Sequence, residues 1–149
     1  MKPITRTILI ILTVLLVSLG TFLVYYQVSF RRAEANGTIP PLAFYTVITA
    51  SMEPTIKVDD VILIRRVNNP ETIKLGDIVT FISMNERSRG IPVTHRVQNI
   101  ENTPEGLRFI TAGDSNITDD MESVSFESIL GRMIFKIPGG AKTPFFSNS

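Results

Sequence analysis

An uncharged run of nineteen residues, from Ile8 to Tyr26, constrains this chain more than any other feature of its sequence. At about 1.5 Å per residue, a helix of this length nearly crosses the apolar core of a bilayer. The run lacks the polar stripe that a helix buried in a soluble protein usually carries. We therefore predict an N-terminal transmembrane anchor within residues 1–30, with Tyr25 and Tyr26 in the interfacial belt.

A cleaved signal peptide is the alternative interpretation of this segment. Lys2 and Arg6 precede the apolar run, and residues 33–35 (AEA) have the small-x-small form of a cleavage site. The run is longer than the usual apolar core of such a signal, and Arg31 and Arg32 separate it from the alanines, which favours the anchor. Because the flanking charges balance, only the amino terminus itself favours a cytoplasmic N-terminus.

The rest of the chain is typical of a linker followed by one β-rich domain. Residues 31–41 form the linker, with a glycine and a proline pair that oppose regular structure. Sustained helical periodicity is absent after the anchor, and short runs rich in β-branched and aromatic residues predict about six strands: FYTVITA, DVILIRRV, DIVTFI, VTHRVQNI, LRFITA and SILGRMIFKI. We predict a mostly-β fold, an antiparallel β-sheet domain over residues 42–140, followed by a C-terminal tail over 141–149.

Composition excludes several function classes. Fifteen Lys and Arg against fourteen Asp and Glu give a net charge of +1, which provides no field for a polyanion, so we expect no nucleic-acid partner. Because the chain has no cysteine, it has no disulfide and no thiolate nucleophile. A single histidine argues against zinc, and Asp119 and Asp120 lack EF-hand spacing, so we expect neither a metal nor an organic cofactor.

Three residues could together form a nucleophilic site. Ser51 in ITASMEPT follows an apolar run and precedes a proline, where a hydroxyl can be exposed beside a free backbone N–H. His95 in VTHRV shares its strand face with Val93 and Val97. Asp114 in TAGDSN is placed to orient a histidine. Each has an ordinary structural explanation as well, namely a turn serine, a partly buried histidine and a turn aspartate.

Taken in order after the anchor, the segments ASMEPT, GDIVTF, THRV, and TAGDSN with a trailing DD resemble the motifs of the type I signal peptidases (peptidase family S26). The segment ILGRMIFKIPG is similar to the family's last conserved block, so the resemblance covers the chain up to Gly140. A histidine stands where the bacterial Ser-Lys branch has its lysine. In this the chain resembles the endoplasmic-reticulum-type branch, which also occurs in archaea and some Gram-positive bacteria.

The resemblance implies roles for individual residues. Ser51 occupies the nucleophile position, and Thr49 takes the place of a serine that helps to form the oxyanion hole together with the Ser51 backbone N–H. His95 stands at the position of the general base. Asp114 and Asp120 are both implicated in this branch, and we favour Asp120 as the partner of His95, with Asp114 in support. A histidine titrates near about 6.5, so it can act as a base without the desolvation that a lysine needs.

The chain departs from the family pattern at two places. Ala50 stands where glycine often precedes the nucleophile, and Asp59-Asp60 stands where Gly-Asp is common. The first change would affect the oxyanion hole if that position needs a positive φ.

The resemblance implies a membrane-bound serine endopeptidase that cleaves signal peptides from exported preproteins on the extracytoplasmic or ER-lumenal side. Its expected partners are signal peptides and the lipid bilayer, with other membrane subunits or the translocon left open. The substrate would add to a strand edge, and Phe44, Val47, Ile48 and Met52 would line shallow pockets or dip into the membrane surface, or alternatively pack as ordinary core. A non-catalytic membrane-anchored scaffold or assembly factor with the same fold is the alternative function.

Overall fold

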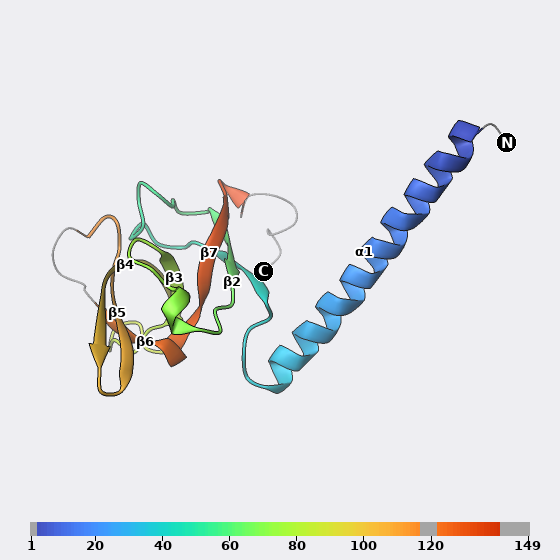
Figure 1. Cartoon of the computed structure of the whole chain (residues 1–149). Helices are drawn as coiled ribbons and strands as arrows, with labels where there is room; N and C mark the ends of the chain where they lie inside the picture. Colours follow the sequence, from blue (N-terminus) through green and yellow to red (C-terminus); the bar gives the residue numbers. More distant parts are fainter. Residues whose placement is uncertain (1–2, 117–121, 141–149) are drawn as a thin grey trace. The chain divides into compact units, whose positions relative to one another are not determined.

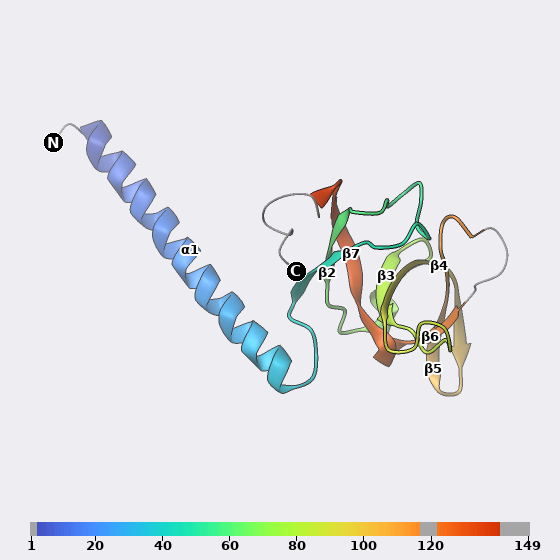
Figure 2. The ribbon, with the colours of Figure 1, turned by 180° about the vertical axis from the view of Figure 1, so that it is seen from behind.

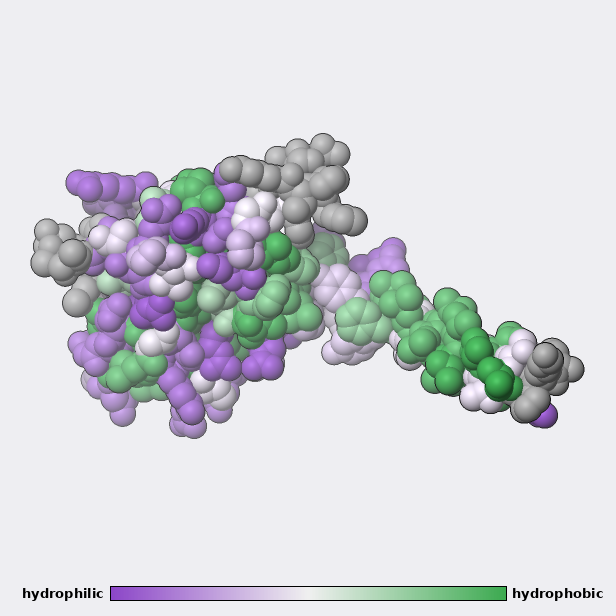
Figure 3. All heavy atoms as spheres, turned by 90° about the horizontal axis from the view of Figure 1, so that it is seen from above, coloured by the Kyte–Doolittle hydropathy of each residue, from purple (hydrophilic) through white to green (hydrophobic). Residues whose placement is uncertain are grey.

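The first compact unit is a single long helix. The computed structural model describes residues 3–116 and 122–140, and helix α1 (Pro3–Ala35) has 33 residues. Its most apolar eighteen-residue window has a mean hydropathy of 2.7, and it is the one helix in the described residues that is long and apolar enough to span a membrane. Figure 3 shows apolar side chains, in green, over much of the helix surface that is in view. The predicted N-terminal apolar helix is therefore confirmed.

The threonine and serine hydroxyls within the apolar run are satisfied by the helix itself. Thr13, Ser18 and Thr21 each donate to a carbonyl oxygen about one turn earlier, at 2.8 to 2.9 Å. Bonds of this kind remove the need for water around a polar group. The helix is thus compatible with an apolar environment even where its sequence is polar.

A glycine turn ends α1. Gly37 has φ +63°, and the Thr38 N–H donates to the Ala33 carbonyl at 2.8 Å, which satisfies one of the free carbonyls at the helix end. The helix continues through Arg31 and Arg32 to Ala35, because no helix-breaking residue precedes Asn36-Gly37. The first five residues of the expected linker 31–41 are consequently helical.

The second compact unit begins at Leu42 and contains an antiparallel sheet, which curls on itself (Figure 1). Two single-turn helices, Pro70–Thr72 and Phe126–Ser128, interrupt the strands. The described residues form seven strands: β1 (Leu42–Thr46), β2 (Val61–Arg65), β3 (Ile78–Ile82), β4 (Pro92–Thr103), β5 (Gly106–Ala112), β6 (Glu122–Ser125) and β7 (Ile129–Ile137). Their order in the sheet is β1-β2-β7-β3-β4-β5-β6, so β1 and β6 are its edges (Figures 1 and 2).

The mostly-β fold with one N-terminal helix is as predicted, and each of the six expected runs overlaps a strand. The additional strand is β6, which pairs with β5 through Val124 opposite Phe109. Its sequence, ESVS, has one apolar residue in four, so neither alternation nor a run of apolar residues marks it. Tertiary pairing, not local sequence, makes this segment a strand.

The core lies on the inner face of the curled sheet. Its buried cluster consists of Ile73, Val79, Phe81, Val97, Phe109, Val124 and Ile129. A bulge in β4 changes the pairing with β5 between Val97 and Asn99. Because the bulge adds one residue, Val97 and Ile100 both pack on the core although strict alternation would place them on opposite faces. With this register, the first half of β4, which includes the buried His95, lies beside the core.

Candidate active site

The loop from residue 47 to residue 60 joins β1 to β2 and carries Ser51. Its ends are closed by hydrogen bonds from the Val47 N–H to the Asp60 carbonyl at 2.8 Å and from the Asp59 N–H to the Val47 carbonyl at 2.9 Å. Asp59 adopts φ +70° at this closure. Glycine adopts a left-handed backbone without strain, which explains why the resembled family often has glycine where this chain has Asp59.

Two buried side chains hold the part of this loop that carries Ser51 against the sheet. Met52 is 1% exposed and Ile56 is 0% exposed, and the Ile56 N–H donates to the Met52 carbonyl at 2.8 Å. Ser51 is thereby left partly buried next to the exposed Thr49, and their hydroxyl oxygens lie 3.3 Å apart. Ala50 is not at a positive φ, since Asp59 is the one non-glycine residue of this kind in the described part of the chain.

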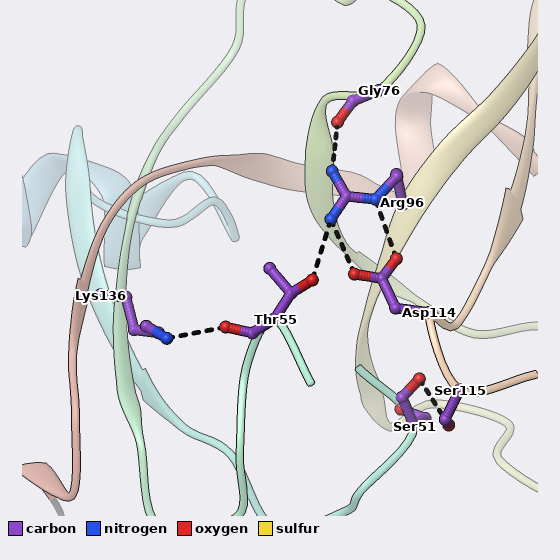
Figure 4. A network of polar contacts seen from close by, with 7 residues as sticks. All are labelled: Ser51, Thr55, Gly76, Arg96, Asp114, Ser115 and Lys136. Carbon is purple, nitrogen blue, oxygen red and sulfur yellow. Dashed lines mark hydrogen bonds and ion pairs between the residues drawn. The ribbon is translucent and has the colours of Figure 1, made fainter. Parts of the chain in front are cut away.

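The turn after β5 packs directly on Ser51. The Ser51 carbonyl accepts hydrogen bonds from the Ser115 N–H at 3.0 Å and from the Ser115 hydroxyl at 2.9 Å (Figure 4). A Cβ atom placed on Gly113 would lie 2.5 Å from the same carbonyl oxygen. Only a glycine therefore allows the two segments to approach this closely.

His95 lies in β4 opposite Val79 and is 8% exposed. Its ring meets the Phe81 ring edge-on, with the centroids 6.2 Å apart. Val97, two residues further, is also buried, in agreement with the predicted sharing of one strand face. The imidazole thus has an apolar wall on one side.

Asp114 forms a two-pronged ion pair with Arg96. The Arg96 Nε donates to Asp114 Oδ1 at 2.8 Å and Nη2 donates to Oδ2 at 2.7 Å. These bonds from Arg96 hold the pKa of Asp114 below its usual value, against the opposing effect of burial, with smaller contributions in the same direction from Thr55 and from the charge of His95. Asp114 is therefore ionised at neutral pH and close enough to His95 to interact with it electrostatically.

The same arginine also contacts the 47–60 loop. Its Nη1 donates to the Gly76 carbonyl at 2.9 Å, and its Nη2 contacts the Thr55 hydroxyl at 3.4 Å (Figure 4). On the other side of the loop, the Lys136 ammonium donates to the Thr55 carbonyl at 2.7 Å. Thr55 is accordingly held by cations from β4 and β7.

Lys136 also neutralises a buried carboxylate, Asp60, at 3.7 Å. Burial raises the pKa of Asp60, but hydrogen bonds from the Lys57 and Gly139 N–H groups and the charge of Lys136 outweigh it, so the pKa lies below its usual value. Asp60 therefore ties the end of the 47–60 loop to the segment after β7.

A cavity of about 250 Å³ opens beside Ser51. Its lining is Tyr45, Thr46, Val47, Ile48, Thr49, Ser51, Met52, Ile56, Ile62, Thr80, Ser88, Ile91, Pro92, Val93 and Thr94. Three of the four predicted pocket residues, Val47, Ile48 and Met52, are among them. Phe44 does not belong to this lining and is 51% exposed. A mostly apolar cavity next to a hydroxyl suits a small apolar side chain of a substrate.

The structure brings Ser51, Thr49 and Asp114 into one region with the strand that carries His95. Asp119 and Asp120 lie outside the described residues, so the preference for Asp120 stays a prediction. No group of three potential metal ligands occurs among residues 3–116 and 122–140.

Sequence reasoning missed four residues of this region: Thr55, Arg96, Ser115 and Lys136. Arg96 follows His95 directly, and Ser115 follows Asp114, so adjacency to candidate residues was a usable signal for both. Thr55 and Lys136 are 81 residues apart, and nothing local connects them.

Comparisons with known proteins point in one direction, although no family model matches the chain. It is 27% identical over 133 residues to signal peptidase I W of Bacillus subtilis, covering 87% of this chain and 68% of that protein. It is 29% identical over 105 residues to the signal peptidase complex catalytic subunit sec11 of Sclerotinia sclerotiorum, covering 66% and 59%. Identity to the SEC11 subunit of Metarhizium acridum is 31% over 85 residues, covering 57% and 48%.

The chain thus spans about half to two thirds of the length of these relatives. These relatives are named as a signal peptidase and as catalytic subunits of signal peptidase complexes. The one N-terminal apolar helix fits single-pass membrane anchoring. On the combined evidence of fold, motif order and relatives, the chain is similar to the signal peptidases.

Proposed function

We propose that this protein is a membrane-bound serine endopeptidase that removes N-terminal signal peptides from secretory preproteins. The observation that carries the proposal is the position of Ser51. Its side chain borders an apolar cavity, while its carbonyl is fixed by two hydrogen bonds from Ser115. A nucleophile needs this combination of a held backbone and an accessible hydroxyl beside a substrate pocket.

In the proposed reaction, the Ser51 Oγ attacks the scissile carbonyl carbon while His95 accepts the hydroxyl proton. The carbon–nitrogen bond then breaks, and His95 returns the proton to the leaving amine. Water hydrolyses the acyl-enzyme by the reverse sequence of proton transfers. The Ser51 N–H and the Thr49 hydroxyl, which lies 3.3 Å from the Ser51 Oγ, stabilise the oxyanion.

The two aspartates have different proposed roles. Asp120 orients the His95 ring and stabilises its positive charge during attack. Asp114 supports the site indirectly, because both of its oxygen atoms are engaged by Arg96. It adds negative potential near His95 and holds the arginine that contacts the Thr55 hydroxyl.

The substrate is proposed to bind as an extended strand along β1, an edge strand of the sheet in the described residues, with small side chains in the adjoining cavity. A membrane anchor on the enzyme and an apolar signal peptide on the substrate raise their effective concentration in one bilayer. The β domain lies on the extracytoplasmic or ER-lumenal side. Because the fungal relatives are named as catalytic subunits of a signal peptidase complex, other membrane subunits are proposed as partners.

Cleavage of a model preprotein by the detergent-solubilised full-length chain tests this function. The wild type is compared with Ser51→Ala and His95→Ala, and the new N-terminus is sequenced. We expect one cut after a small residue and its loss in both variants. A wild type that is inert on several preproteins, in lipid as well as in detergent, would contradict catalysis by this chain alone.

A further inference from the structure

One wall of the cavity is built by the connection between β3 and β4, residues 83–91. Ser88 and Ile91 of this connection line the cavity, and Pro92 continues the lining into β4. The rest of the lining comes from β1, the 47–60 loop, β2, β3 and β4. The position of the 83–91 loop therefore sets the width of the space that a substrate side chain can occupy.

The loop is closed on itself by backbone hydrogen bonds. The Ser83 N–H donates to the Ile91 carbonyl at 3.1 Å, and the Gly90 N–H donates to the Ser83 carbonyl at 2.9 Å. Within the loop, the Ile91 N–H donates to the Ser88 carbonyl at 3.0 Å. These bonds couple Ser83 at the start of the loop to Ser88 and Ile91, so a contact that holds Ser83 also positions the two cavity-lining residues.

That contact is the carboxylate of Glu122, the first residue of β6. Its Oε1 accepts from the Ser83 hydroxyl at 2.9 Å, from the Met84 N–H at 3.1 Å and from the Asn85 N–H at 3.3 Å. Ser83 is 0% exposed, and hydrogen bonds to a carboxylate are stronger than those between neutral groups. These bonds place the 83–91 loop, yellow-green in Figure 2, beside β6.

A continuous chain of hydroxyl groups leads from this carboxylate to the cavity. The Ser88 hydroxyl donates to the Ser83 hydroxyl at 2.8 Å, and the Ser83 hydroxyl donates to Glu122. The backbone of Glu122 is held in turn by Thr111, whose buried hydroxyl donates to the Glu122 carbonyl at 3.4 Å. These hydrogen bonds thus attach the cavity wall at Ser88 to strands β5 and β6.

We propose that Glu122 is a positioning residue that sets the side-chain selectivity of the cavity beside Ser51. The proposal rests on the proposed function, because it concerns the substrate of the same site. An apolar pocket discriminates by roughly 10- to 200-fold per methylene group only while its walls stay in place. Without the carboxylate, the wall of Ser88 and Ile91 is free to shift outward, and larger side chains then enter.

The test compares wild-type chain with Glu122→Ala and Glu122→Gln on matched preproteins that carry alanine, valine or leucine before the cut. In Glu122→Ala we expect the ratio of kcat/KM for alanine over leucine to fall about tenfold, with kcat on the alanine substrate nearly unchanged. Glu122→Gln keeps an oxygen at the Oε1 position that all three donors reach, so its ratio stays within about threefold of wild type. Glu86→Ala, in an exposed part of the same loop, is the charge-removal control and leaves the ratio unchanged.

Hydrogen exchange of the peptide covering residues 83–91 provides a readout that does not depend on cleavage. We expect faster exchange in Glu122→Ala and wild-type exchange in Glu86→Ala. If Glu122→Ala does not fold, Ser88→Ala removes only the hydroxyl at the cavity end of the chain, and it should lower the same selectivity ratio by a smaller factor.

Two results would overturn the proposal in distinguishable ways. An equal loss of kcat/KM on all three substrates, or unchanged exchange of residues 83–91, would show that Glu122 does not hold the wall. A wild type that cleaves none of the preproteins would instead remove the proposed function, and the selectivity with it, while the exchange experiment still judges the contact.

Discussion

Gly113 is the residue on which the position of Ser51 depends most directly. An added Cβ would lie 2.5 Å from the Ser51 carbonyl oxygen, which is a backbone atom and has no flexible end to move aside. Gly113→Ala must therefore displace Ser51 or the turn after β5. We predict a loss of about a hundredfold in kcat/KM with the fold retained. Preprotein cleavage and circular dichroism measure the two effects.

Gly20→Ala is the matched control, because an added Cβ there meets nothing within 4 Å and Gly20 lies in a helix. It should leave the cleavage rate unchanged. Wild-type activity in Gly113→Ala would mean that the close approach to Ser51 has no role in catalysis.

Asp114 should make stability depend on pH in the acid range. Its folded-state pKa lies below the unfolded value because of Arg96, so its contribution is present above about pH 4 and is lost as the pH falls towards the folded pKa. We predict that Asp114→Asn costs about 1 to 3 kcal/mol at neutral pH. Thermal unfolding in detergent at pH 7 and pH 3 should show the gap between wild type and variant shrinking on acidification. A gap that widens towards pH 3 would contradict the lowered pKa.

At the scale of elements, the 47–60 loop is held at Thr55 by Lys136 of β7. Lys136→Met removes the 2.7 Å bond to the Thr55 carbonyl and leaves the carboxylate of Asp60, whose side chain is 5% exposed, without its ammonium partner. We predict a loss of about 1 to 3 kcal/mol in stability and faster hydrogen exchange over residues 52–60. Thermal unfolding and exchange mass spectrometry provide the measurements.

The control for this loop is Lys74→Met, which removes an exposed lysine from the connection before β3. It should change neither quantity. If both lysine variants behave alike, the hydrogen bond from Lys136 to the Thr55 carbonyl does not restrain the 47–60 loop.

Much of this architecture follows from local sequence. The apolar run, the alternating strands and the turn glycines such as Gly106 each have a direct physical cause, and they suffice for the fold class. Ser51, His95 and Asp114 are recognisable as candidates because of their residue type and motif order. Local sequence therefore yields the elements and the chemistry-bearing residues.

What connects those residues is not local. Counting back from the β4–β5 hairpin without a bulge pairs Arg96 with Gly113, whereas the bulge after Val97 pairs it with Ala112. The partnerships of Lys136 with Thr55 and of Glu122 with Ser83 cross 81 and 39 residues. Such contacts depend on strand register and order, which no pattern within one segment specifies.

At the scale of the whole molecule, the proposed cleavage of signal peptides requires the β domain to lie outside the cytoplasm. The chain has no cysteine, so Glu101→Cys on the exposed part of β4 introduces a single thiol. We predict that a membrane-impermeant maleimide labels this thiol in intact cells or spheroplasts. Labelling that appears only after lysis would place the domain on the cytoplasmic side and contradict the proposed topology.

Catalysis by the Ser51 hydroxyl is the central claim, and Ser51→Cys tests it most directly. In a chain without other cysteines, this variant replaces the nucleophilic oxygen by a unique thiol of similar size. The account predicts slow preprotein cleavage that N-ethylmaleimide abolishes, unaffected cleavage by wild type under the same treatment, and none by Ser51→Ala. Cleavage that persists in Ser51→Ala, or a Ser51→Cys activity indifferent to alkylation, would show that another group attacks the scissile bond.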